Sequence, residues 1–334
     1  MNDIARDPFR ERGARPLRWR TRVLGARCEF SSNSRELLSL ARDAFAHVPE
    51  HRWPRAPRGT LRVRLEHLSD GGAARHGMPP KPVLSSGAGL LCGHVDAHNF
   101  AIVDPRAASA LVQVGDALLP HRRLVRYELI EFAAVTLAAR VQELVPLHAG
   151  CVGAHGRGVL LLGGSGSGKS TLALHAALAG LDFLAEDSVF VQPATLRATG
   201  LSAYIHAHAD SLHLLGGHMR RTASASPVIQ RRSGARKHEI DLRGGRAPLA
   251  ARPLRIVAAV VLAARRARGA PRLTPLTPAQ LKRALRAEQA FARDRAGWAE
   301  FEKRLLRAGG FSLPRGSPEQ GVAALRELLE KRPP

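Results

Sequence analysis

Residues 163–170 constrain this chain more than any other part of its sequence. They read Gly-Gly-Ser-Gly-Ser-Gly-Lys-Ser, which satisfies the pattern G-x-x-x-x-G-K-[S/T]. Closely spaced glycines let a backbone wrap around an anion so that its N–H groups point at phosphate oxygens. A helix that begins at such a loop adds the positive end of its dipole. The pattern therefore predicts a phosphate-binding loop, or P-loop.

The side chains of this loop have expected parts in binding a nucleotide. Lys169 is expected to bridge the β- and γ-phosphates and to assist catalysis, and Ser170 to place its hydroxyl on a metal ion. Hard oxygen ligands at a phosphate site favour Mg²⁺ or Mn²⁺. The expected cofactors are therefore ATP and one of these ions. The predicted nucleotide-binding residues are Gly163, Gly164, Ser165, Gly166, Ser167, Gly168, Lys169, Ser170 and Thr171.

The sequence around the loop has the pattern of a strand, a loop, a helix and a second strand. Residues 158–162 are a short apolar run that predicts a strand, and residues 169–179 predict a helix that Gly180 ends. Residues 183–191 predict a second strand, which completes the context that a P-loop needs. Residues 256–262 predict a further core strand. These segments indicate an α/β domain.

The whole chain divides into three expected parts. They are a flexible arm (1–19), a small α+β N-terminal domain (20–124) and the P-loop domain, which ends in helices (125–334). In the N-terminal domain, apolar spacing and a cap at Ser34 or Asn33 predict a helix over residues 35–45. Short strand-like runs are predicted at residues 22–30, 60–66 and 100–103.

The second half of the chain contains further helix and loop signals. Residues 127–144 have apolar residues on all sides and predict a buried helix, whereas residues 216–237 are rich in Ser, Arg and Gly and predict a mobile loop. Thr277 followed by Pro278 predicts the start of a helix. A capping-box start of the last helix is predicted at Ser317, Pro318 and Gln320.

Two adjacent acids follow the P-loop. Residues 183–189 read Phe-Leu-Ala-Glu-Asp-Ser-Val, and Asp187 lies 18 positions after Lys169. Carboxylates at a strand end beside a P-loop can hold Mg²⁺ directly or through water, or accept the proton of an attacking hydroxyl. Glu186 and Asp187 are therefore candidate metal ligands with Ser170, and Asp187 is also a candidate base. The alternative is a pair of exposed acids in a turn.

The formal net charge of +23 raises the question of nucleic-acid binding. Of the 51 basic residues only six are Lys, and they are spread along the chain without the interleaved aromatic residues on which single strands stack. An Arg-rich surface of this kind is what a GC-rich genome would encode. We therefore expect no specific nucleic-acid partner, while attraction to an acidic substrate or peptide stays open.

The sequence indicates a cytoplasmic location. Three cysteines are an odd number without paired spacing, which fits reduced thiols rather than a disulfide framework. The first 20 residues contain no apolar stretch, so they do not resemble a signal peptide. The longest strongly apolar run, residues 256–264, is far too short to cross a bilayer. No membrane partner is expected.

In three elements the chain resembles the catalytic domain of bacterial HPr kinase/phosphorylase. These elements are His148, which lies fifteen residues before Gly163, the glycine-rich loop, and the sequence Ala-Glu-Asp at residues 185–187. It is more similar still to HPr-kinase-related proteins of uncertain substrate, some of which are tailoring kinases in lasso-peptide biosynthesis. The resemblance covers about residues 145–265. Taken alone, His148 is better explained as a structural residue than as a catalytic one.

The resemblance implies a P-loop kinase domain of the type shared by HPr kinase and phosphoenolpyruvate carboxykinase, with the P-loop at the edge of a sheet. It implies transfer of the γ-phosphoryl group of ATP to a serine hydroxyl of a protein or peptide. By position, Asp187 would be the base and His148 would orient or charge-balance the acids. Glu186 stands where the family has its first Asp and would assist in the metal shell.

Two further segments bear on the resemblance. Residues 196–201 lack the acid of the family's second signature, so neither HPr as a substrate nor the reverse phosphorylase reaction is implied. Residues 234–242 resemble a segment of the related proteins in which cations reach toward the nucleotide. Arg236 and Lys237 are thus candidates to neutralise charge on the transferred phosphoryl group, the alternative being a solvated basic loop.

Three classes of function remain open from the sequence. The leading one is a kinase acting on a hydroxyl of a protein, a peptide or a small molecule. The second is a P-loop ATPase, although the acids follow the loop sooner than in transport ATPases and no LSGGQ-like motif is present. The third is a nucleotide-sensing module without catalysis. The sequence leaves the phosphoacceptor and a homo-oligomeric state undecided.

Overall fold

A computed structural model describes residues 16–53, 59–73, 77–201, 203–245, 247–267 and 269–330. The chain divides into two compact units, residues 1–46 with 55–142 and residues 47–54 with 143–334. The first unit therefore ends at Gln142 rather than near residue 124, because the helical stretch before Gln142 packs on its sheet. Of the arm expected at residues 1–19, residues 1–15 lie outside the described residues, and Leu17 already begins a strand.

The first unit is a seven-stranded sheet with helices. The strand order is β1-β2-β3-β7-β6-β5-β4, in which β3 runs parallel to both neighbours and the other pairs are antiparallel. The strands are β1 (Leu17–Val23), β2 (Ala26–Ser32), β3 (Leu61–Leu68), β4 (Val83–Gly87), β5 (Leu90–His94), β6 (Phe100–Asp104) and β7 (Ser109–Gly115). The single strand predicted at residues 22–30 is wrong, since a turn at Leu24 and Gly25 divides it into the β1–β2 hairpin.

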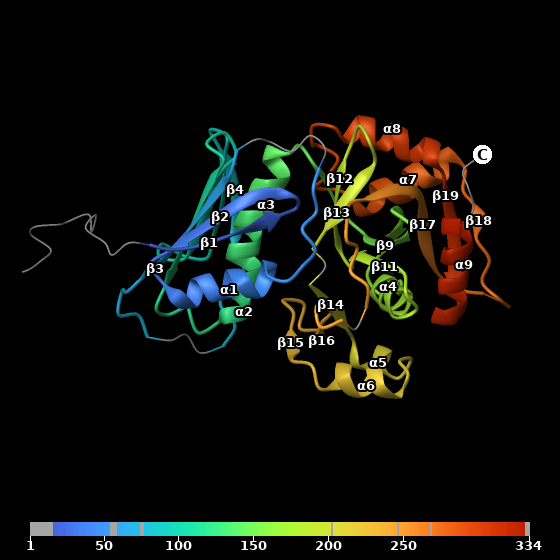
Figure 1. The fold of residues 1–334 in the computed structure, drawn as a ribbon, viewed down its shortest axis with the longest axis horizontal. Helices are drawn as coiled ribbons and strands as arrows, with labels where there is room; N and C mark the ends of the chain where they lie inside the picture. The colour runs from blue at the N-terminus through green and yellow to red at the C-terminus, as the bar shows by residue number, and fades with distance from the viewer. Residues whose placement is uncertain are drawn as a thin grey trace, which may run out of the picture. The chain divides into compact units, whose positions relative to one another are not determined.

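The helices of this unit follow their local sequence signals. Helix α1 (Arg35–Phe45) is confirmed with Ser34 as its cap, whose hydroxyl accepts the backbone N–H of Leu37. The predicted buried helix is a continuous stretch of α2 (Arg122–Leu124), a π-helical segment (Val125–Glu131) and α3 (Phe132–Val141). Figure 1 shows α3 lying along the sheet, where it packs against β3, β6 and β7.

The second unit contains a nine-stranded mixed sheet. Its main strand order is β11-β9-β10-β17-β13-β12-β8, and β19 and β18 extend it from β17. The strand β10 is internal and runs parallel to β17, which in turn runs parallel to β19. The strands are β8 (Val145–His148), β9 (Gly150–Ala154), β10 (Arg157–Leu162), β11 (Asp182–Ala185), β12 (Ser188–Gln192), β13 (Arg197–Gly200), β17 (Leu254–Arg266), β18 (Thr274–Pro275) and β19 (Gly310–Arg315).

Helices cover both faces of this sheet. On β10, Val159 and Leu161 join the core under α4 (Lys169–Leu178) and α9 (Pro318–Glu330), while Leu160 and Leu162 join the core under α7 (Pro278–Glu288) and α8 (Trp298–Ala308). This alternation is what a strand buried on both faces requires. The start of α7 predicted at Thr277 and Pro278 is confirmed, as is the capping box predicted at the start of α9. The result is a three-layer mixed α/β unit (Figure 1).

A small sheet adjoins α4. It consists of β14 (Tyr204–Ala207), β16 (Arg236–Asp241) and β15 (Val228–Gln230), with the short helices α5 (Ala209–Leu212) and α6 (Gly217–Ser224) beside it. The mobile loop predicted at residues 216–237 is therefore wrong. The segment is mostly polar, but a few apolar side chains in it are buried in the core and hold it in place, among them Ala223 and Ile229. Within the described part of the chain, no helix is long and apolar enough to cross a bilayer.

Candidate functional site

The P-loop joins the carboxyl end of β10 to the start of α4. The helix begins at Lys169, directly after Gly168, whose φ of 97° lies in the left-handed region. At Gly163 φ is 144°, and a Cβ there would lie 2.8 Å from Ser167 Oγ and 3.1 Å from the carbonyl oxygen of Leu262. Only glycine fits this position. The glycine thus allows the tight backbone turn that an anion-binding loop needs.

Two polar groups of the loop are held ready for an anion. Lys169 is 7% exposed, and its Nζ donates hydrogen bonds to the carbonyl oxygens of Gly163 and, at 3.3 Å, Gly164. Ser167 Oγ is buried without a hydrogen-bond partner among the described residues. A buried cation resting on backbone carbonyls, together with an unsatisfied hydroxyl, fits a bound phosphate group. Thr171 lies one turn into the helix, 3.4 Å from Ser211 Oγ.

Asp187 and His148 form an ion pair beside this loop. His148 is the last residue of β8 and lies opposite Ser188 in the register of β8 and β12. Its Nδ1 lies 2.9 Å from Asp187 Oδ1, and the side chains are 46% and 42% exposed. As expected, the two acids follow directly on the end of a strand, β11, and they form its turn to β12. The strand predicted over residues 183–191 is therefore two strands.

Positive charges gather around the Asp187 carboxylate. Burial raises its pKa, but the hydrogen bond from His148 and the charges of His148, Lys169 and Arg231 outweigh burial and lower the pKa. The hydrogen bond to Asp187 raises the pKa of His148, against burial and the charge of Lys169, which lower it. Each partner thus favours the charged form of the other, the carboxylate of Asp187 and the imidazolium of His148, in the field of Lys169.

Arg231 is a site residue that the sequence did not single out. It lies in the turn between β15 and β16, where its backbone N–H donates to Ala235 at 2.8 Å. Arg236 and Lys237 lie on β16 itself, and within the described residues neither forms a hydrogen bond or ion pair with the P-loop or the acids. The segment predicted as a loop contains several cations, and no local signal distinguishes the turn residue Arg231 from the others.

Gln289 is a second residue that the sequence did not reveal. This side chain is 2% exposed and lies just after α7. Its Oε1 accepts the backbone N–H of His148 at 2.8 Å, and its Nε2 donates to the carbonyl oxygen of His148 at 2.9 Å. One buried amide thus fixes the backbone from which the imidazole extends. No local pattern links two residues so far apart in the chain.

Glu186 contacts a second histidine, His206. The Glu186 side chain is buried, and its Oε2 accepts the backbone N–H of His206 at 2.7 Å and lies 3.2 Å from His206 Nδ1. His206 Nε2 lies 3.5 Å from Glu239 Oε1. Burial lowers the pKa of His206, but the hydrogen bonds to Glu186 and Glu239 outweigh it and raise the pKa. The structure thus gives the two adjacent acids different partners.

The candidate metal ligands other than Glu186 are Ser170 and Asp187, and they fit a metal ion that arrives with a nucleotide. Within the described ranges, no group of three or more His, Cys, Asp or Glu side chains is arranged to hold a metal ion. Ser170 and Asp187 supply one hydroxyl and one carboxylate near the loop. Mg²⁺ commonly keeps several waters and is bound by one or two protein oxygens plus substrate phosphates. The donor set therefore fits Mg²⁺ that arrives bound to ATP.

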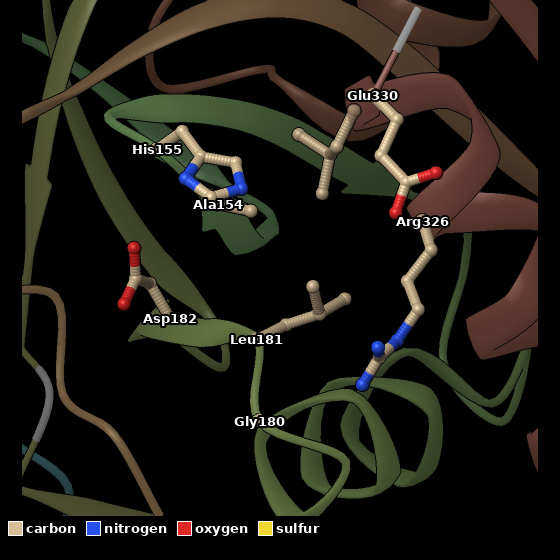
Figure 2. Close-up of a pocket in the computed structure, with 8 residues that line it drawn as sticks. Ala154, His155, Gly180, Leu181, Asp182, Arg326 and Glu330 are labelled. Atoms are coloured by element: carbon tan, nitrogen blue, oxygen red, sulfur yellow. The ribbon is translucent and has the colours of Figure 1, made fainter.

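A cavity of about 310 Å³ lies at the other end of β10 and α4 (Figure 2). Its lining includes charged side chains of both signs, His155, Asp182, Arg326 and Glu330. Burial raises the pKa of Asp182, against the charges of His155 and Arg252, which lower it. Since α4 has ten residues, it separates this cavity from the P-loop by about 15 Å. The cavity is thus distinct from the candidate site at the P-loop.

Comparisons with known proteins add little to this geometry. No protein-family model matches the chain, and no curated protein matches it. Among solved structures, it is similar to the Hpr(Ser) kinase/phosphatase from Coxiella burnetii, with 13% sequence identity and a TM-score of 0.28. The similarity covers 55% of this chain and 95% of that chain. At this TM-score the match does not establish a shared function.

Proposed function

We propose that this chain is an ATP-dependent phosphotransferase that moves the γ-phosphoryl group of ATP to a hydroxyl, that of a serine in a protein or peptide. The observation that carries the proposal is the Asp187–His148 ion pair in the field of Lys169. A P-loop alone indicates nucleotide binding. An ionised carboxylate beside its lysine adds a group that can take a proton from an acceptor.

Each residue of the site has a separate role in the proposed reaction. Asp187 takes the proton of the acceptor hydroxyl as the oxygen attacks the γ-phosphorus, the bond from phosphorus to the bridging oxygen breaks, and ADP leaves. Lys169 and Arg231 offset negative charge on the transferred group. His148 holds Asp187 ionised and oriented. Mg²⁺ bound to the nucleotide, with Ser170 and Asp187 as protein donors, would supply further charge neutralisation.

The fate of the γ-phosphate tests the proposal. The purified chain is incubated with γ-³²P-labelled ATP, Mg²⁺ and a cytoplasmic extract or peptide library, with Lys169→Ala as the control. Label in a stable acceptor, lost in the variant, supports a kinase. Label in inorganic phosphate alone would show an ATPase instead, and bound but unreacted ATP would show a sensing module. Either result would overturn the proposal.

A further inference from the structure

Three buried ionisable side chains lie directly behind the proposed catalytic turn. Glu186, His206 and Glu239 are 6%, 8% and 9% exposed. Charged groups are seldom buried to this degree unless they are paired. The proposed reaction uses none of the three, so their burial calls for another explanation.

The cluster joins two separate parts of the fold. His206 lies on β14 directly opposite Glu239 on β16, and these two side chains share one face of the small sheet. The neighbours Ile205 and Ile240 belong to the core shared with α4, as strand alternation requires. Glu186 comes from the main sheet, in the turn between β11 and β12. His206 therefore bridges the small sheet to that turn.

Both connected parts carry a group of the proposed site. On one side, Glu186 is followed in the chain by Asp187, so a force on its carboxylate acts on the backbone of Asp187. On the other side, Glu239 lies on the strand that follows the Arg231 turn. The charge of Arg231 acts on Asp187 and on His206 alike. The bridge thus connects the turn of the proposed base to the hairpin of a cation whose charge acts on that base.

We propose that His206 is a positioning residue, which clamps the turn carrying Asp187 to the hairpin carrying Arg231 through Glu186 and Glu239. This inference rests on the proposed function and deepens it, because it separates the acid pair into a reacting acid and an anchoring acid. Glu186 serves the placement of Asp187 rather than the acceptor. Removal of such an outer contact commonly costs about 10- to 100-fold in activity while the reacting groups remain.

Three substitutions of His206 distinguish its two contacts. His206→Asn keeps a donor near the place of Nδ1, toward Glu186, whereas His206→Gln keeps one near the place of Nε2, toward Glu239. His206→Met fills the space without either donor. We expect kcat to fall by about 10- to 100-fold in His206→Met and less in His206→Asn, with the Kd of Mg·ATP within about threefold of wild type.

A double-mutant cycle shows whether His206 acts through Asp187. If it does, His206→Met should cost little further activity in a chain that already carries Asp187→Asn, because the positioned group is gone. The matched control is His51→Gln, a change at another buried histidine with two hydrogen bonds, of 2.6 Å to Thr199 Oγ1 and 2.7 Å to the Ala250 carbonyl oxygen. The control should add its effect to that of Asp187→Asn.

A measurement without nucleotide keeps this inference separate from the proposed function. In chains with ¹⁵N-labelled histidine, the His148 imidazole signals report the contact with Asp187 and are assigned with His148→Gln. They should move in His206→Met and in Glu239→Gln but not in His51→Gln. Unmoved His148 signals would overturn the clamp, as would an additive double-mutant cycle. If the His148 signals move but the chain transfers no phosphate, the positioning role of His206 is supported and the proposed kinase function is rejected.

Discussion

Asp187→Asn tests the proposed base more directly than any other substitution. The variant keeps the size of the side chain and a hydrogen-bond partner for His148 Nδ1, which lies 2.9 Å from Asp187 Oδ1, but it removes the carboxylate. General acid–base catalysis contributes about 10²- to 10⁴-fold to a rate, which corresponds to about 2.7 to 5.4 kcal/mol of barrier. We therefore expect kcat to fall within about that range and the Kd of Mg·ATP to stay within a few-fold.

Lost stability cannot produce a change of that size. The side chains of His148 and Asp187 are 46% and 42% exposed, and an ion pair this open to solvent contributes about 0.2 to 1 kcal/mol to folding. For a unit of this size, 1 kcal/mol shifts Tm by about 2 to 4 °C. The variant should therefore remain folded in the assay, so a large loss of kcat reports the chemistry.

The assay follows the transfer of ³²P from γ-labelled ATP to the acceptor, with Mg·ATP binding measured by calorimetry. Asp182→Asn is the matched control, since it is the same change at the other end of β11, beside the cavity away from the P-loop. The control should keep wild-type kcat. Unchanged turnover in Asp187→Asn would refute the base. Loss of Mg·ATP binding instead would identify Asp187 as chiefly a metal ligand and reject it as the base.

Four further predictions follow from the site and the sequence. Lys169→Ala removes the cation of the loop, so ATP affinity or turnover should fall by orders of magnitude with the fold intact; unchanged Mg·ATP binding by calorimetry, together with unchanged turnover, would contradict this. Turnover should stop in excess EDTA and return with Mg²⁺ or Mn²⁺, and full activity in EDTA would exclude a required metal ion. Association with DNA or RNA should be weak and vanish near physiological ionic strength, whereas a sequence-selective nanomolar complex at that salt would show the charge to be functional. Burial lowers the pKa of His51 despite its hydrogen bond to the Ala250 carbonyl, so the unfolded chain binds the proton first as pH falls below about 6.5, and the free energy of unfolding decreases. Denaturant titrations at several pH values should show less of this acid loss in His51→Gln, and an equal loss would refute the assignment.

The sequence predicted the features that depend on neighbouring residues. The strand, loop and helix around the P-loop, and the helices that begin at Arg35 and Pro278, carry their signals within a few positions. Caps and apolar spacing act over one turn, so a single sequence suffices to locate them. The sequence also identifies Glu186 and Asp187 as candidate site residues, because two adjacent acids shortly after a P-loop are a local pattern.

The parts that the sequence missed depend on residues distant in the chain. The small sheet is ordered by isolated apolar residues such as Ile205, Ile229 and Ile240, which pack beside α4 but form no long apolar run. Because this segment is predicted as a loop, the sequence does not identify Arg231 as a residue of a β-turn. Gln289 contacts His148 across 141 positions, and an amide just after a helix carries no signal for such a contact.

The division of the acid pair follows from the backbone that surrounds it. Glu186 and Asp187 lie in the turn between β11 and β12, where their carboxylates contact two different histidines, His206 and His148. The turn that holds them is packed on both sides by glycine. A Cβ on Gly150 would lie 3.1 Å from the Glu186 carbonyl oxygen, and one on Gly200 would lie 2.6 Å from Ala185 Cβ. The neighbouring backbone therefore approaches the turn closely on both sides. In this setting the Asp187 carboxylate lies in the field of Lys169, whereas that of Glu186 contacts His206, which is the division of roles that the proposed clamp requires.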